Sequence, residues 1–304
     1  MQRRAIVGLS VAVCAIFGAA AYWYSLRSHG APTSLVATLP SADASVIYVD
    51  VDALRRSGIL GMLQGAKTSE DPDYQQFVRD TQFDYRHDLD ALAGAVKDGR
   101  TYFALRGRFH WKNLSAYAAQ HGGSCHDNFC VTPGSQADRR ISFYLLKPDL
   151  LALAVAPDDF AAYQVAAKSA KNLPPTPKEP VWASIPASAL QSAGTLPSAA
   201  QAFVPALKGA DQIVFSLGGN SGQQLELALH VTCKDSAGAT VLIAQLESIT
   251  KELRDVAARQ HRKADPADLS ALLVAGNFRR DERQVYGTWP IPKAFVDAFA
   301  GSVY

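Results

Sequence analysis

The chain has 304 residues, of which 48% are hydrophobic and 19% are charged, and its formal net charge is +2. This composition excludes overall disorder, and the length allows one large domain or two of about 130 residues each. Basic residues are scattered in pairs such as Arg55–Arg56 and Arg279–Arg280, without the stripe of basic and aromatic residues that binds nucleic acid. Nucleic acid is therefore not expected as a partner.

The N-terminus predicts a membrane anchor. Residues 5–26 have no charged side chain and follow Arg3 and Arg4. At a rise of ~1.5 Å per residue such a helix reaches ~33 Å, enough to cross a hydrocarbon core of ~30 Å. We expect a cytoplasmic tip at 1–4, a single transmembrane helix at 5–26 in the inner (cytoplasmic) membrane, and an extracytoplasmic remainder. Cleavage of a signal peptide at Ala19-Ala20-Ala21 is the alternative, and it also exports the chain.

The exported part is expected to start with a linker at 27–38, followed by a first half at 39–170. Hydrophobic periodicity and turn residues predict the elements of this half. They are a strand at 46–51, a helix at 53–61 capped by Asp52, a helix from 71, a helix over 83–96, a strand at 101–107, a helix at 111–120, a hairpin of 141–146 with 150–155, and a helix over 160–170.

A proline-rich linker at 171–180 is expected to lead into a second half at 181–304. Its predicted elements are strands at 181–185, 212–217 and 225–231, a helix near 198–207, a long helix over 237–260, a hairpin of 272–279 with 284–289, and a terminal helix at 293–299. The residues Leu225, Leu227, Leu229 and Val231 alternate with polar or small ones, as in a half-buried strand.

The two halves resemble each other. Asp52 and Ser188 each follow a predicted strand, and the Pro157/Phe160 pair matches Pro292/Phe295 at a nearly equal offset. Such a repeat indicates an old duplication. The predicted fold is therefore α+β, with two similar halves of antiparallel sheet that have helices on one face, plus the N-terminal transmembrane helix.

The cysteines predict one disulfide. Cys125 and Cys130 lie between Gly122-Gly123 and Pro133-Gly134, a pattern typical of a turn, and in an oxidising compartment a disulfide would close it. A metal or redox site with His126 is the alternative, but no second ligand pair exists and the spacing is not C-x-x-C. Cys233 is expected to be buried, and Cys14 lies in the membrane segment.

Other candidate sites have structural interpretations. Asp50-Val51-Asp52 after a strand is similar to the first motif of dehalogenase-like phosphatases, but Ala53 and Leu54 depart from it and Asp52 is expected to cap a helix. The glycine-rich segment 218–222 is expected to be a hairpin loop. The histidines lack a catalytic motif; they are His29, His87, His110, His121, His126, His230 and His261. No catalytic, cofactor-binding or metal-binding residue is expected.

The opening Leu39-Pro40-Ser41-Ala42-Asp43-Ala44, which runs into a strand, resembles a family of uncharacterised bacterial membrane-anchored exported proteins. Gly107-Arg108-Phe109 and the turn at 122–125 are also similar to members of that group. The resemblance implies a location in the cell envelope and similar α+β halves, and it implies no activity.

These observations predict a membrane-tethered extracytoplasmic module that binds or scaffolds a partner in the bacterial cell envelope. One alternative is an envelope enzyme, either a thiol-redox factor at Cys125/Cys130 or a hydrolase. Another is a carrier of apolar ligands, because a sheet covered by helices on one face can leave an apolar concavity on the other. A deep apolar pocket would favour the carrier.

Overall fold

The computed structural model describes residues 32–64, 72–165, 173, 176–186, 189, 204–207, 209–219, 225–259 and 269–296. The predicted tip and anchor at 1–26 lie outside these residues, as do Ser188 and residues 27–31 of the predicted linker at 27–38. Residues 32–36 of that linker form a short helix instead. Within the described ranges, no helix combines the length and apolarity that a membrane span requires.

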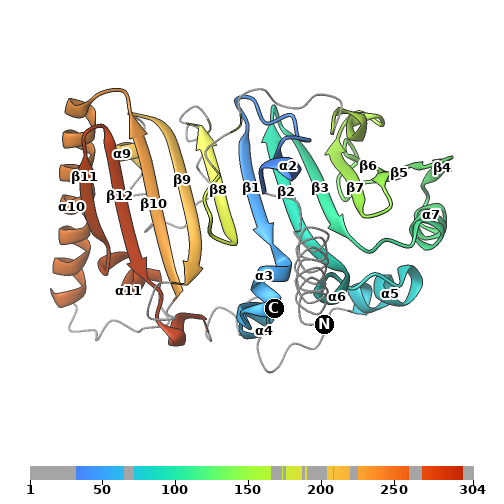
Figure 1. The fold of residues 1–304 in the computed structure, drawn as a ribbon, viewed down its shortest axis with the longest axis horizontal. Coiled ribbons are helices and arrows are strands. Elements are labelled where there is room, and N and C mark those ends of the chain that lie inside the picture. The colour runs from blue at the N-terminus through green and yellow to red at the C-terminus, as the bar shows by residue number, and fades with distance from the viewer. Residues whose placement is uncertain are drawn as a thin grey trace, which may run out of the picture.

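The described strands form one antiparallel sheet of 12 strands that runs across the whole molecule (Figure 1). In the first half the strands are β1 (Ser45–Asp50), β2 (Leu89–Lys97), β3 (Arg100–Gly107), β4 (Ser124–His126), β5 (Phe129–Pro133), β6 (Arg140–Lys147) and β7 (Leu150–Ala156). In the second half they are β8 (Val181–Pro186), β9 (Ala210–Gly219), β10 (Leu225–Cys233), β11 (Asn277–Asp281) and β12 (Gln284–Pro290).

The halves meet where β1 pairs with β8, and we call this pair the seam. Outward from the seam the first half has the order β1-β2-β3-β7-β6 and the second half has the order β8-β9-β10-β12-β11. In the first half the hairpin of β6 and β7 folds back so that β7 pairs with β3. In the second half the hairpin of β11 and β12 folds back so that β12 pairs with β10. The pair β5 and β4 extends the first half only. The predicted α+β class with antiparallel sheet is confirmed, and the two halves share a single sheet.

The helices differ between the halves. The described helices are α2 (Pro32–Val36), α3 (Val51–Arg56), α4 (Ile59–Gln64), α5 (Pro72–Thr81), α6 (Tyr85–Asp88), α7 (Trp111–Gln120), the 3-10 helix η1 (Ala161–Gln164), α9 (Val204–Leu207), α10 (Ser236–Arg259) and α11 (Leu269–Val274). Between its third strand and last hairpin the first half has α7 with β4 and β5, whereas the second half has α10 and α11. The long helix and the cysteine hairpin are thus where the halves diverge.

The register defines the two faces of the sheet. One cross-strand row runs Leu153, Phe103, Gly94, Ile47, Ala183, Phe215. Its first-half end belongs to the core under α7, and its second-half end to the core under α10. We call this the α7/α10 face. On the opposite face, α2 and η1 cover an alanine-rich core in the first half. Helices therefore lie on both faces, and the expectation of helices on one face is wrong.

Residues 83–96 were predicted as a helix, and this is wrong. They form the short α6 and then β2. Ala91, Ala93 and Ala95 favour helix by intrinsic propensity, but here they form the floor under α2 and η1, where a larger side chain would have no room. On the other side of β2, a Cβ at Gly94 would lie 3.0 Å from the Ile47 side chain and 3.2 Å from the Phe103 ring. Packing on both faces therefore overrides local propensity.

Candidate functional site

An apolar cavity of about 280 Å³ lies between α5, α7 and the sheet. We call it the α7 cavity. It is lined by Phe77, Phe83, Leu89, Leu105, Phe109, Leu114, Tyr117, Ala118, His121, Thr132, Ile141, Phe143, Leu151 and Leu153. No acidic or basic side chain other than His121 is among these lining residues.

The walls of the α7 cavity are built from segments distant in the chain. Leu114 and Ala118 lie one turn apart on α7 and face Leu151 and Phe143 of the sheet, and all four are buried. A ladder of ring contacts closes one side: Phe77 meets Tyr117 edge-on at 5.2 Å and Phe83 at 6.4 Å. Such rings form a rigid apolar wall.

The helices over the α7 cavity are tied together by polar contacts. Asn113 of α7 donates to the carbonyl oxygen of Thr81, the last residue of α5, at 3.3 Å.

At the rim of the α7 cavity, His121 follows α7, is exposed, and stacks on Tyr117 with ring centroids 4.0 Å apart. Its Nδ1 lies 2.8 Å from the carbonyl oxygen of Tyr117. His121, Thr132 and the hydroxyl of Tyr117 are thus the polar side-chain groups among the residues that line an otherwise apolar space.

This arrangement suits an apolar ligand. An apolar cavity of ~150 Å³ stays dry and binds a molecule as large as benzene, and the α7 cavity is nearly twice that size. Water inside would find few hydrogen-bond partners, so an apolar guest displaces nothing that is strongly held. A charged guest would lose its hydration without an opposite charge to replace it.

The predicted disulfide is present and supports the wall beside α7. Cys125 and Cys130 are bonded and are direct cross-strand partners in the β4–β5 pair. Cys130 is fully buried, and both cysteines pack in the core under α7. Among the described residues no group of three or more His, Cys, Asp or Glu side chains is placed to hold a metal ion. Cys233 is a free, buried thiol, and its burial raises its pKa.

The Asp50/Asp52 pair is structural, although the predicted cap was wrong by two residues. Asp50 is the N-cap of α3, and its carboxylate accepts from the backbone N–H of Ala53 at 2.8 Å. Asp52 lies in the first turn and pairs with Arg55 at 3.1 Å and Arg56 at 2.9 Å. The helix begins earlier than expected because β1 leads into it without a loop.

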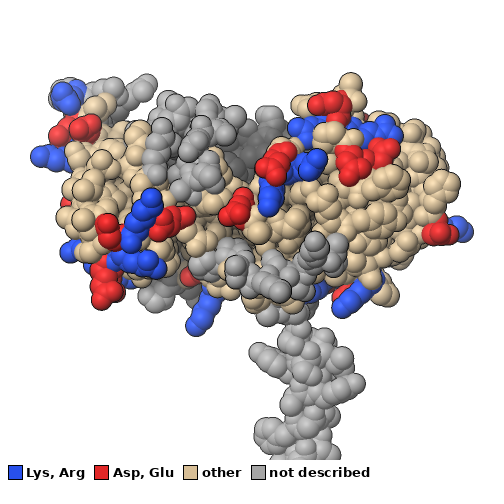
Figure 2. Space-filling model, turned by 90° about the horizontal axis from the view of Figure 1, so that it is seen from above, with Lys and Arg blue, Asp and Glu red and all other residues tan. Residues whose placement is uncertain are grey.

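His230 contacts neighbouring strands of the second half. His230 lies on β10 with its Nε2 2.6 Å from Oε1 of Gln284, and its ring stacks on Tyr286 at 4.7 Å. Arg279 lies over the other side of that tyrosine, 3.9 Å from the ring centroid. His29 and His261 lie outside the described residues. On the face seen in Figure 2, acidic and basic side chains are interspersed among the coloured residues.

Sequence reasoning did not find the α7 cavity. The only indication of this cavity in the sequence is a set of four aromatic residues, Phe77, Phe83, Phe109 and Tyr117. At this spacing such residues are more often closely packed core, and nothing in the sequence shows that they leave space between them.

Comparison with known proteins gives the fold alone. No family model and no curated protein matches the chain. Solved structures of TP0453 do match: crystal form III aligns with a TM-score of 0.51 and 9% identity over 88% of this chain and 97% of that chain. Crystal form I aligns with a TM-score of 0.48 and 9% identity over 88% of this chain and 96% of that one. The chain is thus similar to TP0453 in its mixed α+β architecture.

Proposed function

We propose that this chain is a membrane-tethered module of the bacterial cell envelope that binds an apolar molecule in the α7 cavity. The observation that supports binding is the cavity itself, an apolar space of about 280 Å³ under α5 and α7. Binding sites for small molecules are typically concave, largely preformed and lined by apolar and aromatic side chains with a few polar groups.

The lining defines the class of ligand. Its body is aromatic or aliphatic, because the buried floor of Leu114, Ala118 and Phe143 offers no hydrogen bond from a side chain. One polar group of the ligand can lie at the rim, where His121 and Thr132 provide donors and acceptors. The ligand is therefore a small amphiphile or an uncharged apolar compound.

Filling the α7 cavity should weaken binding. Ala118 is 1% exposed and lines the cavity, so Ala118→Phe places a ring in the space that the ligand needs. In the chain from residue 32 onward, the fluorescent compound 1-aminoanthracene should bind to the unchanged protein. The variant should bind at least about tenfold more weakly, a loss of ~1.4 kcal/mol. Fluorescence titration measures both affinities.

The matched control is Ala119→Phe on the same helix, since Ala119 is exposed and does not line the cavity. This variant should retain the affinity of the unchanged protein. Equal binding by all three proteins would contradict the proposal, as would the absence of binding to the unchanged chain. Circular dichroism confirms that each protein is folded.

We propose the envelope location because residues 5–26 have the length and apolarity of a membrane helix. The Cys125–Cys130 disulfide supports it, since such bonds persist in oxidising compartments. In protein taken from cells, mass spectrometry without reduction should find the link between Cys125 and Cys130. A chain that lacks residues 1–30 should remain in the cytoplasm with both thiols free.

The first residue of the mature protein, read by the same mass spectrometry, separates the anchor from a cleaved signal peptide. A mature protein that begins near Tyr22 would replace the anchor by a cleaved signal peptide and leave the export intact. Free thiols at both positions in the full-length cellular protein would contradict export itself.

A further inference from the structure

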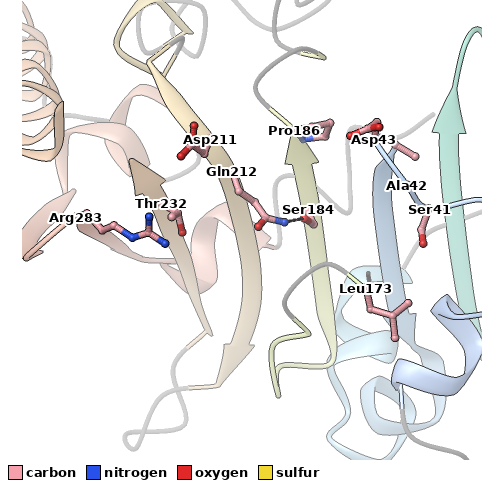
Figure 3. Close-up of a pocket in the computed structure, with 11 residues that line it drawn as sticks. Ser41, Ala42, Asp43, Leu173, Ser184, Pro186, Asp211, Gln212, Thr232 and Arg283 are labelled. Atoms are coloured by element: carbon pink, nitrogen blue, oxygen red, sulfur yellow. Dashed lines mark hydrogen bonds between the residues drawn. The ribbon is translucent and has the colours of Figure 1, made fainter. Parts of the chain in front are cut away.

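A second cavity, of about 470 Å³, lies at one end of the seam. We call it the seam pocket. It is bordered by the loop before β1, the end of β8, the start of β9, the end of β10 and the β11–β12 turn (Figure 3). Its volume is in the range of ~300–1,000 Å³ that is typical of sites for small organic ligands.

The sheet changes character at this place. On the face opposite α7 and α10, one cross-strand row is mostly apolar in the first half, where Ala154, Tyr102, Ala95 and Val46 lie side by side and Ser142 is the polar residue beyond Ala154. Across the seam the same row continues with Ser184, Val214, His230, Tyr286 and Arg279. The next row contains Gln212, Thr232 and Gln284. The two halves share a strand order, so the polar row is a property of the second half and not of the architecture.

The polar side chains at the seam pocket keep hydrogen-bonding capacity after their internal bonds are made. Ser184 is 2% exposed and accepts from Nε2 of Gln212 at 2.9 Å, so its own hydroxyl proton remains available. Thr232 donates to Oε1 of Gln284 at 3.0 Å, so its oxygen can still accept. The dashed line in Figure 3 marks the first of these bonds. Each group can therefore serve a ligand without losing its present partner.

The charges at the seam pocket are of both signs. Arg283, from the β11–β12 turn, offers donors only, whereas Asp211 and Asp43 offer acceptors only. In Figure 3 the guanidinium lies beside Thr232 at one side, and Asp43 lies near Pro186 at the other. An anion would face two carboxylates, and a cation would face a guanidinium. A hydroxyl group both donates and accepts, so it is matched by all of these side chains.

The seam pocket is also elongated. Thr232 and the loop before β1 are separated by the strands β9 and β8, which is three steps between neighbouring strands. At ~4.8 Å per step this span is ~14 Å. Such a length suits a short chain of linked units that crosses the strands.

We propose that the seam pocket binds a neutral, hydroxyl-rich ligand, namely a short segment of saccharide chain. Ser184, Gln212 and Thr232 hydrogen-bond its hydroxyl groups from the sheet. Arg283 and Asp211 add charge-assisted hydrogen bonds on one side, and Asp43 adds one on the other. This site is separate from the α7 cavity and uses none of its residues.

The test uses the full-length chain in a poly(oxyethylene) detergent, because a detergent with a sugar headgroup would compete. Maltotriose and chitotriose are titrated by calorimetry, beside the zwitterionic peptide trialanine and inorganic phosphate. We expect at least one of the saccharides to bind with a dissociation constant in the millimolar range and the other two compounds not to bind. Asp211→Asn should weaken saccharide binding about tenfold, the effect of losing one charge-assisted hydrogen bond.

The matched control is Asp281→Asn, an exposed carboxylate near the same turn that does not line the pocket, and it should bind like the unchanged protein. Arg283→Gln tests the site a second time from a different element. Saccharide binding that neither Asp211→Asn nor Arg283→Gln weakens would overturn the proposal. So would failure of both saccharides to bind, or tighter binding of trialanine or phosphate. None of these outcomes bears on the binding of 1-aminoanthracene to the α7 cavity, so the two proposals are tested separately.

Discussion

Replacing Trp182 by alanine is expected to lower the free energy of unfolding by about 3–5 kcal/mol. Trp182 lies on β8 and is 1% exposed, and it stacks on its cross-strand partner Tyr48 with ring centroids 5.7 Å apart. It belongs to the core of the first half although its strand starts the second half. The same burial raises the pKa of Tyr48 to about 12, so that ring stays neutral. Loss of Trp182 therefore removes a buried aromatic contact across the seam.

Chemical denaturation followed by circular dichroism measures this effect. The control is Trp182→Phe, which keeps a ring against Tyr48 and removes an indole N–H that is buried without a hydrogen-bond partner among the described residues. Because an unsatisfied buried donor costs about 1–3 kcal/mol, its removal offsets part of the space left by the smaller ring. The loss for Trp182→Phe should be only about 1 kcal/mol. Equal losses for the two variants would show that the ring does not hold the seam.

The sequence was informative where one periodicity extends over a whole element. Leu225, Leu227, Leu229 and Val231 alternate on β10, and Leu229 and Val231 are buried under α10 as a half-buried strand requires. The long helix and the hairpin of β6 with β7 were predicted for the same reason. The Cys125–Cys130 link could be predicted because its partners are only five residues apart in the sequence.

Features that depend on distant segments could not be predicted. Ala91, Ala93 and Ala95 were assigned to a helix because nothing local shows that α2 and η1 pack on them. The α7 cavity depends on how closely α5 and α7 approach the sheet, a distance that no residue pattern encodes. Whether the halves share a sheet depends on the pairing of β1 with β8, whose strands are 130 residues apart. Val46 of β1, for example, is the cross-strand partner of Ser184 of β8.

Replacing Leu246 by alanine should lower the free energy of unfolding by about 2–5 kcal/mol. Leu246 is fully buried near the middle of α10, in the core that this helix forms with β10, β12 and α11. The helix lies over one edge of the sheet and meets no other long helix among the described elements, so its apolar stripe is its main attachment. Truncation leaves a cavity that the sheet below cannot fill. Denaturation of the full-length chain in detergent measures the loss.

The control is Val256→Ala on the same helix. The spacing of Leu242, Leu246, Ile249, Leu253 and Val256 predicts one continuous stripe that faces the core. In the structure Leu242 is buried and Leu253 packs against the core, but Val256 is 44% exposed. Val256→Ala should therefore change the free energy of unfolding by no more than about 0.5 kcal/mol. A loss at Val256 as large as that at Leu246 would contradict the exposed position of Val256 on the last turns of α10.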